Sequence, residues 1–202
     1  MRILIWLLFA ALTGVYISRP LSDPDLWWHL VAGDWILSHM KVPYVDYWTM
    51  FSSGHLWRAY SWMSEAVFAF VEGHGGVAAL VLLEFAVAFS IVVSFFYCFG
   101  RIAKDWFFGA LLGILTSAGC VSHFALRPQS LTWAFLVWII YIADRISEEG
   151  FTRKRGLQMA FVMALWANNH ITTVLGLVAL AAWIISRGGA ISGLKALLCG
   201  FA

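Results

Sequence analysis

Charged residues are scarce in this sequence of 202 residues. Only 12% are Asp, Glu, Lys or Arg, whereas 62% are hydrophobic and the mean hydropathy is +0.82. Ordinary soluble domains have about 25% charged and about 45–50% apolar residues. A water-soluble domain with so little charge would struggle to cover its own surface. The composition therefore excludes an ordinary soluble fold and predicts an integral membrane protein.

Several signatures of soluble function are also missing. No Gly-rich phosphate loop follows a strand, no basic patch indicates a nucleic-acid partner, and no His pair has H-x-x-H or H-x-x-x-H spacing. We therefore expect no soluble cofactor and no dedicated metal centre. The three cysteines are Cys98, Cys120 and Cys199. The first two fall at opposite ends of neighbouring predicted helices, too far apart for a disulfide, so we expect all three to be reduced.

Long apolar runs are abundant instead, and they predict an all-α, polytopic transmembrane helix bundle of about six spans in a single membrane domain, 1–202. A lone helix needs about 20 residues to cross a bilayer, so the ends of the shorter runs must be sheltered by neighbours or lie at headgroup depth. The first run resembles a signal peptide but lacks an A-x-A-like cleavage site, so we expect it to stay as a helix. The final ISGLKALLCGFA predicts the start of a seventh span. The six runs are 3–17, 77–99, 107–121, 130–143, 157–167 and 171–185.

The basic residues predict the orientation of the bundle. With the N-terminus in the cytoplasm, nine of them lie inside and four outside, in agreement with the positive-inside rule. The same orientation puts all six histidines at the outer side and makes residues 18–76 an outer loop. The inner set is Arg2, Arg101, Lys104, Arg145, Arg153, Lys154, Arg155, Arg187 and Lys195, and the outer set is Arg19, Lys41, Arg58 and Arg127.

The outer loop, 18–76, holds six of the twelve tryptophans and six of the eleven acids. Its first part, DPDLWWHLVAGDWILSHM, predicts a helix with Asp23 as N-cap and Pro24 at the first helical position. Because Trp rings prefer the headgroup region, we expect this helix to lie in the membrane interface. A second short helix is predicted from Ser61 or Ser64 to the glycines at 73–76.

Asp25 and His29 are four residues apart on the first predicted helix, so their side chains share a face. One interpretation is structural, with Asp23 capping the helix and Asp25 interacting with its dipole. It leaves His29 unexplained. The other interpretation is a proton-handling or metal-holding pair at the membrane boundary.

Five blocks occur in a recognisable order: DPDLWWHLVAGDWI, VPYVD, WRAYSWMSEAVF, ALRPQS and LWANNHITTVLGL. Together they resemble a large bacterial family of membrane proteins that is similar to GT-C glycosyltransferases of the mannosyl/arabinosyl type, which use polyprenyl-phosphate sugars. The resemblance covers most of the 202 residues but only the N-terminal part of a typical member. Such enzymes run to several hundred residues, so we expect either a fragment or a reduced relative.

The resemblance implies a role for the acids of the outer loop. In GT-C enzymes this loop carries an essential carboxylate that acts as base toward the acceptor or helps to hold a metal. That role would fall on Asp25, with Asp23 as its partner and His29 beside them. A divalent metal is left open, with Asp23 and Asp25 as its only candidate ligands. The location implied is the bacterial cytoplasmic membrane.

A departing lipid phosphate needs positive charge, and Arg127 and Arg58 are the candidates. We expect Arg127 and Asp25 to border one outer-leaflet cavity. The alternative for Arg127 is snorkelling toward the headgroups. Glu65 and His170 either reach the same cavity or are satisfied by neighbouring helices.

Three further polar residues lie within or beside predicted spans. Glu84, about two turns below the outer end of its span, is either functional or held protonated by a hydrogen bond. Asn168 and Asn169 are expected to cap helix ends.

Two functions from different classes follow. The first is a GT-C-like membrane glycosyltransferase module that takes a sugar from a polyprenyl-phosphate donor at the outer face. The second is a non-catalytic, reduced GT-C-like accessory subunit that packs in a larger membrane protein complex. Membrane lipids are expected partners of both.

Overall fold

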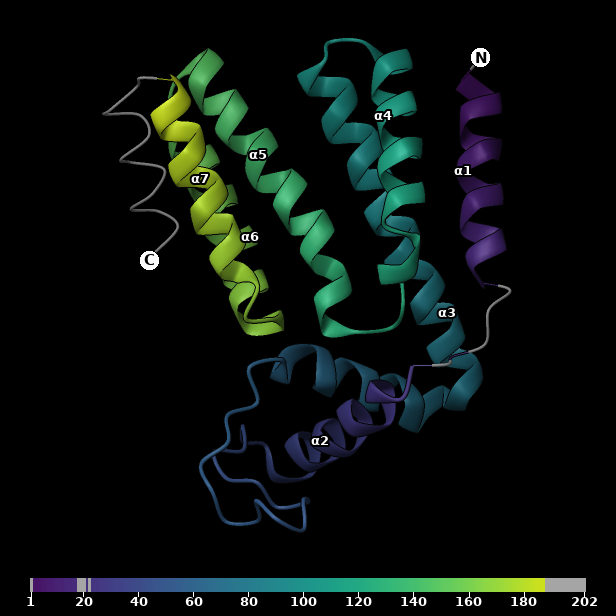
Figure 1. The fold of residues 1–202 in the computed structure, drawn as a ribbon, viewed down its shortest axis with the longest axis vertical. Helices are drawn as coiled ribbons and strands as arrows, with labels where there is room; N and C mark the ends of the chain where they lie inside the picture. The colour runs from purple at the N-terminus through teal and green to yellow at the C-terminus, as the bar shows by residue number, and fades with distance from the viewer. Residues whose placement is uncertain (1, 18–20, 22, 188–202) are drawn as a thin grey trace.

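The computed structural model describes residues 2–17, 21 and 23–187, and these fold as helices joined by short turns and one long loop (Figure 1). Within them no β-strand forms, although Val45 and Leu56 make an isolated antiparallel bridge. The predicted all-α class is confirmed. The elements are α1 (Arg2–Ile17), α2 (Asp25–His39), α3 (Trp62–Ile102), α4 (Trp106–Gly119), η1 (Val121–His123), η2 (Pro128–Leu131), α5 (Thr132–Glu149), α6 (Arg153–Asn169) and α7 (Thr173–Arg187).

The helices form an upright group and a group that lies across one end of it. Figure 1 shows α1, α4, α5, α6, α7 and the later part of α3 standing side by side, with α2 and the first part of α3 lying across their lower end. The bend is at Gly76, where φ is 62° and ψ is −163°. A residue without Cβ adopts this conformation readily. The predicted short helix and the predicted span 77–99 are thus two arms of one bent helix.

Two helices of the described chain are long and apolar enough to cross a membrane: Trp62–Ile102 and Pro128–Glu149. In the most apolar 18-residue stretch of Trp62–Ile102 only 22% is buried inside the protein, so most of its apolar side chains face outward. Two further apolar helices, Trp106–Gly119 and Thr173–Ser186, are shorter than the 18 residues required of a candidate span. At 1.5 Å per residue α4 is about 21 Å long, against about 30 Å of hydrocarbon. The six-span bundle therefore stays a prediction, and the seventh span, 191–202, lies outside the described residues.

Side-chain packing centres on α3. One cluster joins it to α1, α4 and α5, a second joins α5, α6 and α7, and a third holds α2 against both arms of α3. Gly109 of α4 touches Gly100 of α3 so closely that a Cβ on Gly109 would lie 2.3 Å from the Gly100 Cα. Close backbone contact through small residues is typical of helix pairs in membranes. Cys98 and Cys120 are buried and free, as predicted, whereas Cys199 lies outside the described residues.

Candidate functional site

The start of α2 is organised by two carboxylates with different surroundings. Asp23 accepts a hydrogen bond from the Asp25 backbone N–H (3.0 Å), and its carbonyl accepts one from Leu26. The Asp23 side chain is only 6% exposed, whereas that of Asp25 is 62% exposed. Asp23 was predicted as the N-cap. The cap position is instead Pro24, which has a helical backbone and no side chain able to bond. The helix therefore starts one residue later than predicted.

Arg127 joins these carboxylates although it lies more than a hundred residues away in the sequence. Its Nη2 donates to Asp23 Oδ1 at 2.6 Å, its Nε contacts the other oxygen of Asp23, and Nη2 lies 3.5 Å from Asp25 Oδ2. Arg127 precedes Pro128 and has the extended backbone that a following proline favours (φ −126°, ψ 147°). The structure thus brings the side chains of Arg127 and Asp25 together. The cavity that they were expected to border stays a prediction.

One turn further along α2, His29 meets Glu65 of α3. The His29 Nδ1 lies 3.1 Å from Glu65 Oε1, and the two side chains are 16% and 3% exposed. The second oxygen of Glu65 is buried without a hydrogen-bond partner among the described residues. Gly33 makes this approach close, because a Cβ there would lie 2.0 Å from the Glu65 carbonyl oxygen. A small residue in α2 thus sets the distance between His29 and its carboxylate.

His170 lies in the turn between α6 and α7. Its Nδ1 accepts the Thr172 backbone N–H at 3.2 Å, and the Tyr60 ring contacts its imidazole edge-on, with the centroids 5.5 Å apart. Burial lowers the pKa of His170, and the charge of nearby His29 lowers it further. A neutral imidazole whose Nδ1 accepts carries its proton on Nε2. His170 is therefore a neutral neighbour of the His29–Glu65 pair.

Arg58 is placed differently from the other candidates. Its guanidinium carbon lies 5.5 Å from the centroid of the Tyr44 ring, in the long loop between α2 and α3. A cation over a tyrosine face is a modest, mainly local stabilising contact. The structure thus groups six of the seven predicted site residues around α2 and leaves Arg58 on the loop.

The long loop folds back over α2 and builds an aromatic cluster that the sequence did not predict. Trp28 meets Trp48 and Trp57 edge-on at 5.6 and 6.0 Å, and Trp35 stacks on Tyr47 at 5.2 Å. The sequence signal was the recurrence of aromatics in YVDYW and HLWRAY. Without the loop conformation, however, their partners were not predictable.

Asp46 holds the turn of this loop. Its carboxylate accepts the backbone N–H groups of Trp48 (2.9 Å) and Thr49 (3.0 Å) and the Thr49 hydroxyl. The hydroxyl hydrogen bond is the largest cause of the lowered pKa of Asp46. Sequence reasoning did not single out Asp46.

Three polar residues have structural partners. The Tyr16 hydroxyl donates to Glu84 Oε1 at 3.1 Å, so Glu84 has a hydrogen-bond partner on α1. Asn168 accepts from Trp62 Nε1 at 2.9 Å, and Asn169 accepts from the Ser64 hydroxyl. The residue at the C-cap of α6 is His170 and not one of the predicted asparagines. Their side chains tie the end of α6 to the start of α3, and Asn168 also donates to the Ala164 carbonyl of α6 at 2.8 Å.

The charges of the site are unbalanced. Asp23, Asp25 and Glu65 contribute three carboxylates, and Arg127 is the permanent cation among these contacts. Within the described residues no group of three His, Cys, Asp or Glu side chains is arranged to hold a metal ion. Asp23, one of the two acids left open as metal ligands, is engaged by Arg127 on both oxygens.

No family model, curated protein or solved structure matches this chain.

Proposed function

We propose that this chain is the outer-face module of a GT-C-like membrane glycosyltransferase, which transfers a sugar from a polyprenyl-phosphate donor. In this proposal about six helices span a bacterial cytoplasmic membrane, the N-terminus is cytoplasmic, and α2 lies in the outer interface. The observation that carries it is Asp25, an exposed carboxylate 3.5 Å from the guanidinium of Arg127 at the start of α2. The sugar chemistry comes from the motif resemblance.

The membrane part of the proposal is supported by apolar surface that faces outward from the helices. Soluble monomers rarely expose contiguous apolar patches larger than a few hundred Å², and larger ones mark membrane or protein contacts. The exposed large side chains on the upright helices include Leu82, Phe89, Leu111, Leu112, Leu115, Val174, Val178 and Ile185.

In the proposed reaction the acceptor hydroxyl oxygen attacks the anomeric carbon of the donor. The bond between that carbon and the phosphate oxygen breaks, polyprenyl phosphate leaves, and the acceptor proton passes to Asp25. Asp25 suits this role better than Asp23, because Asp23 is buried and held on both oxygens by Arg127. General base catalysis requires an accessible group that can reach the acceptor proton.

Arg127 has a different role from the one expected for a free phosphate anchor. Two carboxylates already surround it, so a donor phosphate would have to compete with Asp25 for Nη2. We assign to Arg127 the role of positioning Asp25. Its side chain is 32% exposed, and only this exposed part can contact a donor phosphate. His29 and Glu65 form a second proton-handling pair one turn away. No step is assigned to a metal.

The test is a substitution that removes the proton acceptor at position 25 and keeps the shape of the side chain. In membranes containing the chain, Asp25→Asn should lower the release of polyprenyl phosphate from a panel of labelled polyprenyl-phosphate sugars by roughly 10²–10⁴. Asp34→Asn is the matched control, because Asp34 is an exposed acid on the same helix. It should leave the release unchanged. Active wild type with an equally active Asp25→Asn variant would remove the catalytic assignment.

The second candidate is a non-catalytic accessory subunit, which is favoured by the short apolar helices α4 and α7. Partner helices in a larger complex could shelter their ends. Trp27, which is 54% exposed, should then contact a partner, whereas Trp28 packs within the chain. In this case Trp27→Ala should weaken co-purification of a partner and Asp25→Asn should be silent. A chain that purifies alone and releases polyprenyl phosphate would exclude this candidate.

A further inference from the structure

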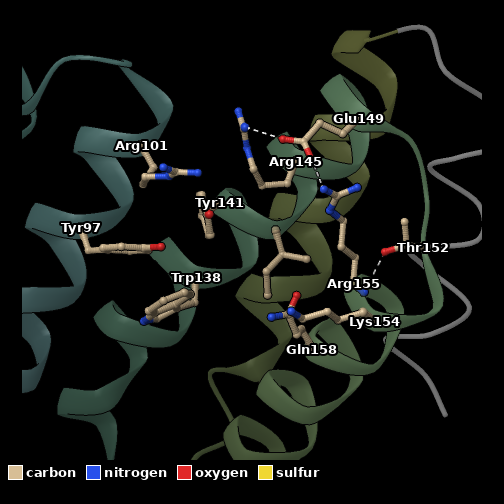
Figure 2. A pocket seen from close by; sticks show the side chains of 11 residues that line it. Tyr97, Arg101, Trp138, Tyr141, Arg145, Glu149, Thr152, Lys154, Arg155 and Gln158 are labelled. Atoms are coloured by element: carbon tan, nitrogen blue, oxygen red, sulfur yellow. Dashed lines mark hydrogen bonds and ion pairs between the residues drawn. The ribbon is translucent and has the colours of Figure 1, made fainter.

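A pocket of about 370 Å³ lies at the end of the upright helices opposite to α2, between α3, α5 and α6. Figure 2 shows Tyr97 and Arg101 entering from α3, Trp138, Tyr141 and Arg145 from α5, and Lys154, Arg155 and Gln158 from α6. Its volume falls within the about 300–1,000 Å³ typical of small-molecule sites. It contains none of the residues assigned to the proposed sugar transfer.

An aromatic wall closes one side of this pocket. Tyr97 stacks on Trp138 with the ring centroids 5.6 Å apart, and Tyr141 meets both rings edge-on, at 5.9 Å from Tyr97 and 5.7 Å from Trp138. Trp and Tyr rings suit the headgroup level of a membrane, where one edge of a ring is wet and the other is apolar. The aromatic wall is therefore suited to the membrane interface, where the polar headgroup of a lipid joins its acyl chains.

Two arginines on the other side are held by acids. Arg145 donates to Asp144 (3.1 Å), Glu148 and Glu149 (2.8 Å for the last). Arg155 contacts Glu149 and donates to the Gly150 carbonyl at 2.8 Å. Glu149, the only acid of the pocket lining, is thus shared by two guanidinium groups (Figure 2). These pairs fix the pocket wall and neutralise its acid.

Two further cations remain uncommitted. Within the described residues Arg101 and Lys154 form no ion pair, and both line the pocket, one from α3 and one from α6. Neighbouring Lys104 is engaged by Glu148 at 2.9 Å and does not line it. In all, four cations and one acid line the space. Like charges held around one cavity repel each other, and an anion bound between them relieves that repulsion.

We propose that this pocket binds a phosphate group, held between Arg101 and Lys154, with the aromatic wall beside the substituent of the phosphate. Arginine presents its donors as a planar fork that matches phosphate oxygens, and lysine acts as a point charge opposite. Basic pockets between membrane helices are suited to anionic lipid headgroups. The phosphate is carried either by such a lipid or by a soluble compound. This inference does not depend on the proposed sugar transfer.

The experiment uses the full chain purified in detergent, with two probes. The lipid arm measures binding of phosphatidylglycerol by native mass spectrometry, and the soluble arm measures the thermal shift caused by inorganic phosphate. Arg101→Gln and Lys154→Gln should each weaken binding about fivefold, which corresponds to about 1 kcal/mol per basic residue near an anionic surface, and the double variant about 25-fold. Arg153→Gln is the matched control, since Arg153 neighbours Lys154 but does not line the pocket.

The two sources of phosphate give different results. A loss confined to the lipid arm identifies a lipid headgroup, and a loss of the inorganic-phosphate shift identifies a soluble phosphate. The charge-retaining variant Lys154→Arg should bind within about threefold of wild type, which separates lost binding from lost folding. Arg101→Lys keeps the charge but loses the planar fork, so it should weaken binding less than Arg101→Gln does. The proposal is overturned if neither arm responds to the double variant. It is equally overturned if Arg153→Gln weakens binding as much as Lys154→Gln.

Discussion

Gly33 should control the contact between α2 and α3, and Gly33→Ala tests this. A Cβ at this position would lie 2.0 Å from the Glu65 carbonyl oxygen and 2.7 Å from the Ala69 Cβ, whereas ordinary contacts begin near 3.4 Å. The helices must therefore separate by about 1.4 Å, and overpacking of this kind costs about 1–3 kcal/mol. The His29–Glu65 hydrogen bond, now 3.1 Å, would be stretched beyond the usual limit, which adds roughly 1 kcal/mol.

The assay is denaturant unfolding of the purified chain in detergent, followed by tryptophan fluorescence, with ¹⁵N NMR of the histidine side chains as a second measurement. Gly33→Ala should lower the free energy of unfolding by about 2–4 kcal/mol and change the His29 Nδ1 signal. Gly73→Ala is the control, because a Cβ at Gly73 in α3 meets nothing within 4 Å. It should stabilise slightly, by at most about 1 kcal/mol. Wild-type stability with an unchanged His29 signal in Gly33→Ala would refute the close contact.

Three further predictions concern charge. Arg127→Gln should destabilise the chain by about 2–3 kcal/mol in the same unfolding assay, because it leaves a buried carboxylate unpaired, while Arg58→Gln should cost at most about 1 kcal/mol. The lowered pKa of Asp46 means that its stabilising effect is complete above its ordinary pKa of 3.8 and is lost as the pH falls through the lower folded value. The protection factors of the loop amides against hydrogen exchange should therefore fall in acid, and Asp46→Asn should abolish that dependence. The pKa of His170 lies below its ordinary value of 6.5, so its NMR signal should still report a mainly neutral ring at pH 6.5; a mainly protonated ring there would contradict the burial.

The helices near α2 were largely predictable, because local patterns specify them. The DPDLWW start predicted a helix that the structure gives as Asp25–His39, and the glycines at 73–76 marked the bend at Gly76. Apolar runs also placed α4, α5, α6 and α7, with ends that differ by a few residues. The number of membrane spans was less accessible. Whether a helix as short as α4 crosses a bilayer depends on its neighbours and not on its own sequence.

The partners of the site residues were only partly predictable, since periodicity carries no long-range information. Arg127 and Asp25 were expected at one cavity because of their shared depth, and the structure brings their side chains within 3.5 Å. The sequence could not predict that the Arg127 guanidinium contacts both carboxylate oxygens of Asp23. Similarly, the contact of Asn169 with Ser64 spans 105 residues. A local reading assigned this asparagine to a helix cap, the commonest local role of its residue type.

The division of labour between Asp23 and Asp25 follows from where their neighbours lie. Two acids only two residues apart would repel each other, yet one guanidinium in contact with both lowers that repulsion. Because Arg127 takes both oxygens of the buried Asp23 and only approaches the exposed Asp25, one carboxylate is fixed and the other is left accessible. Pro128 restricts the backbone that presents Arg127, and Gly33 fixes the second pair one turn away. The site therefore depends on α2, the first arm of α3 and the turn before η2 being in place together. No single one of the quoted motifs contains all three.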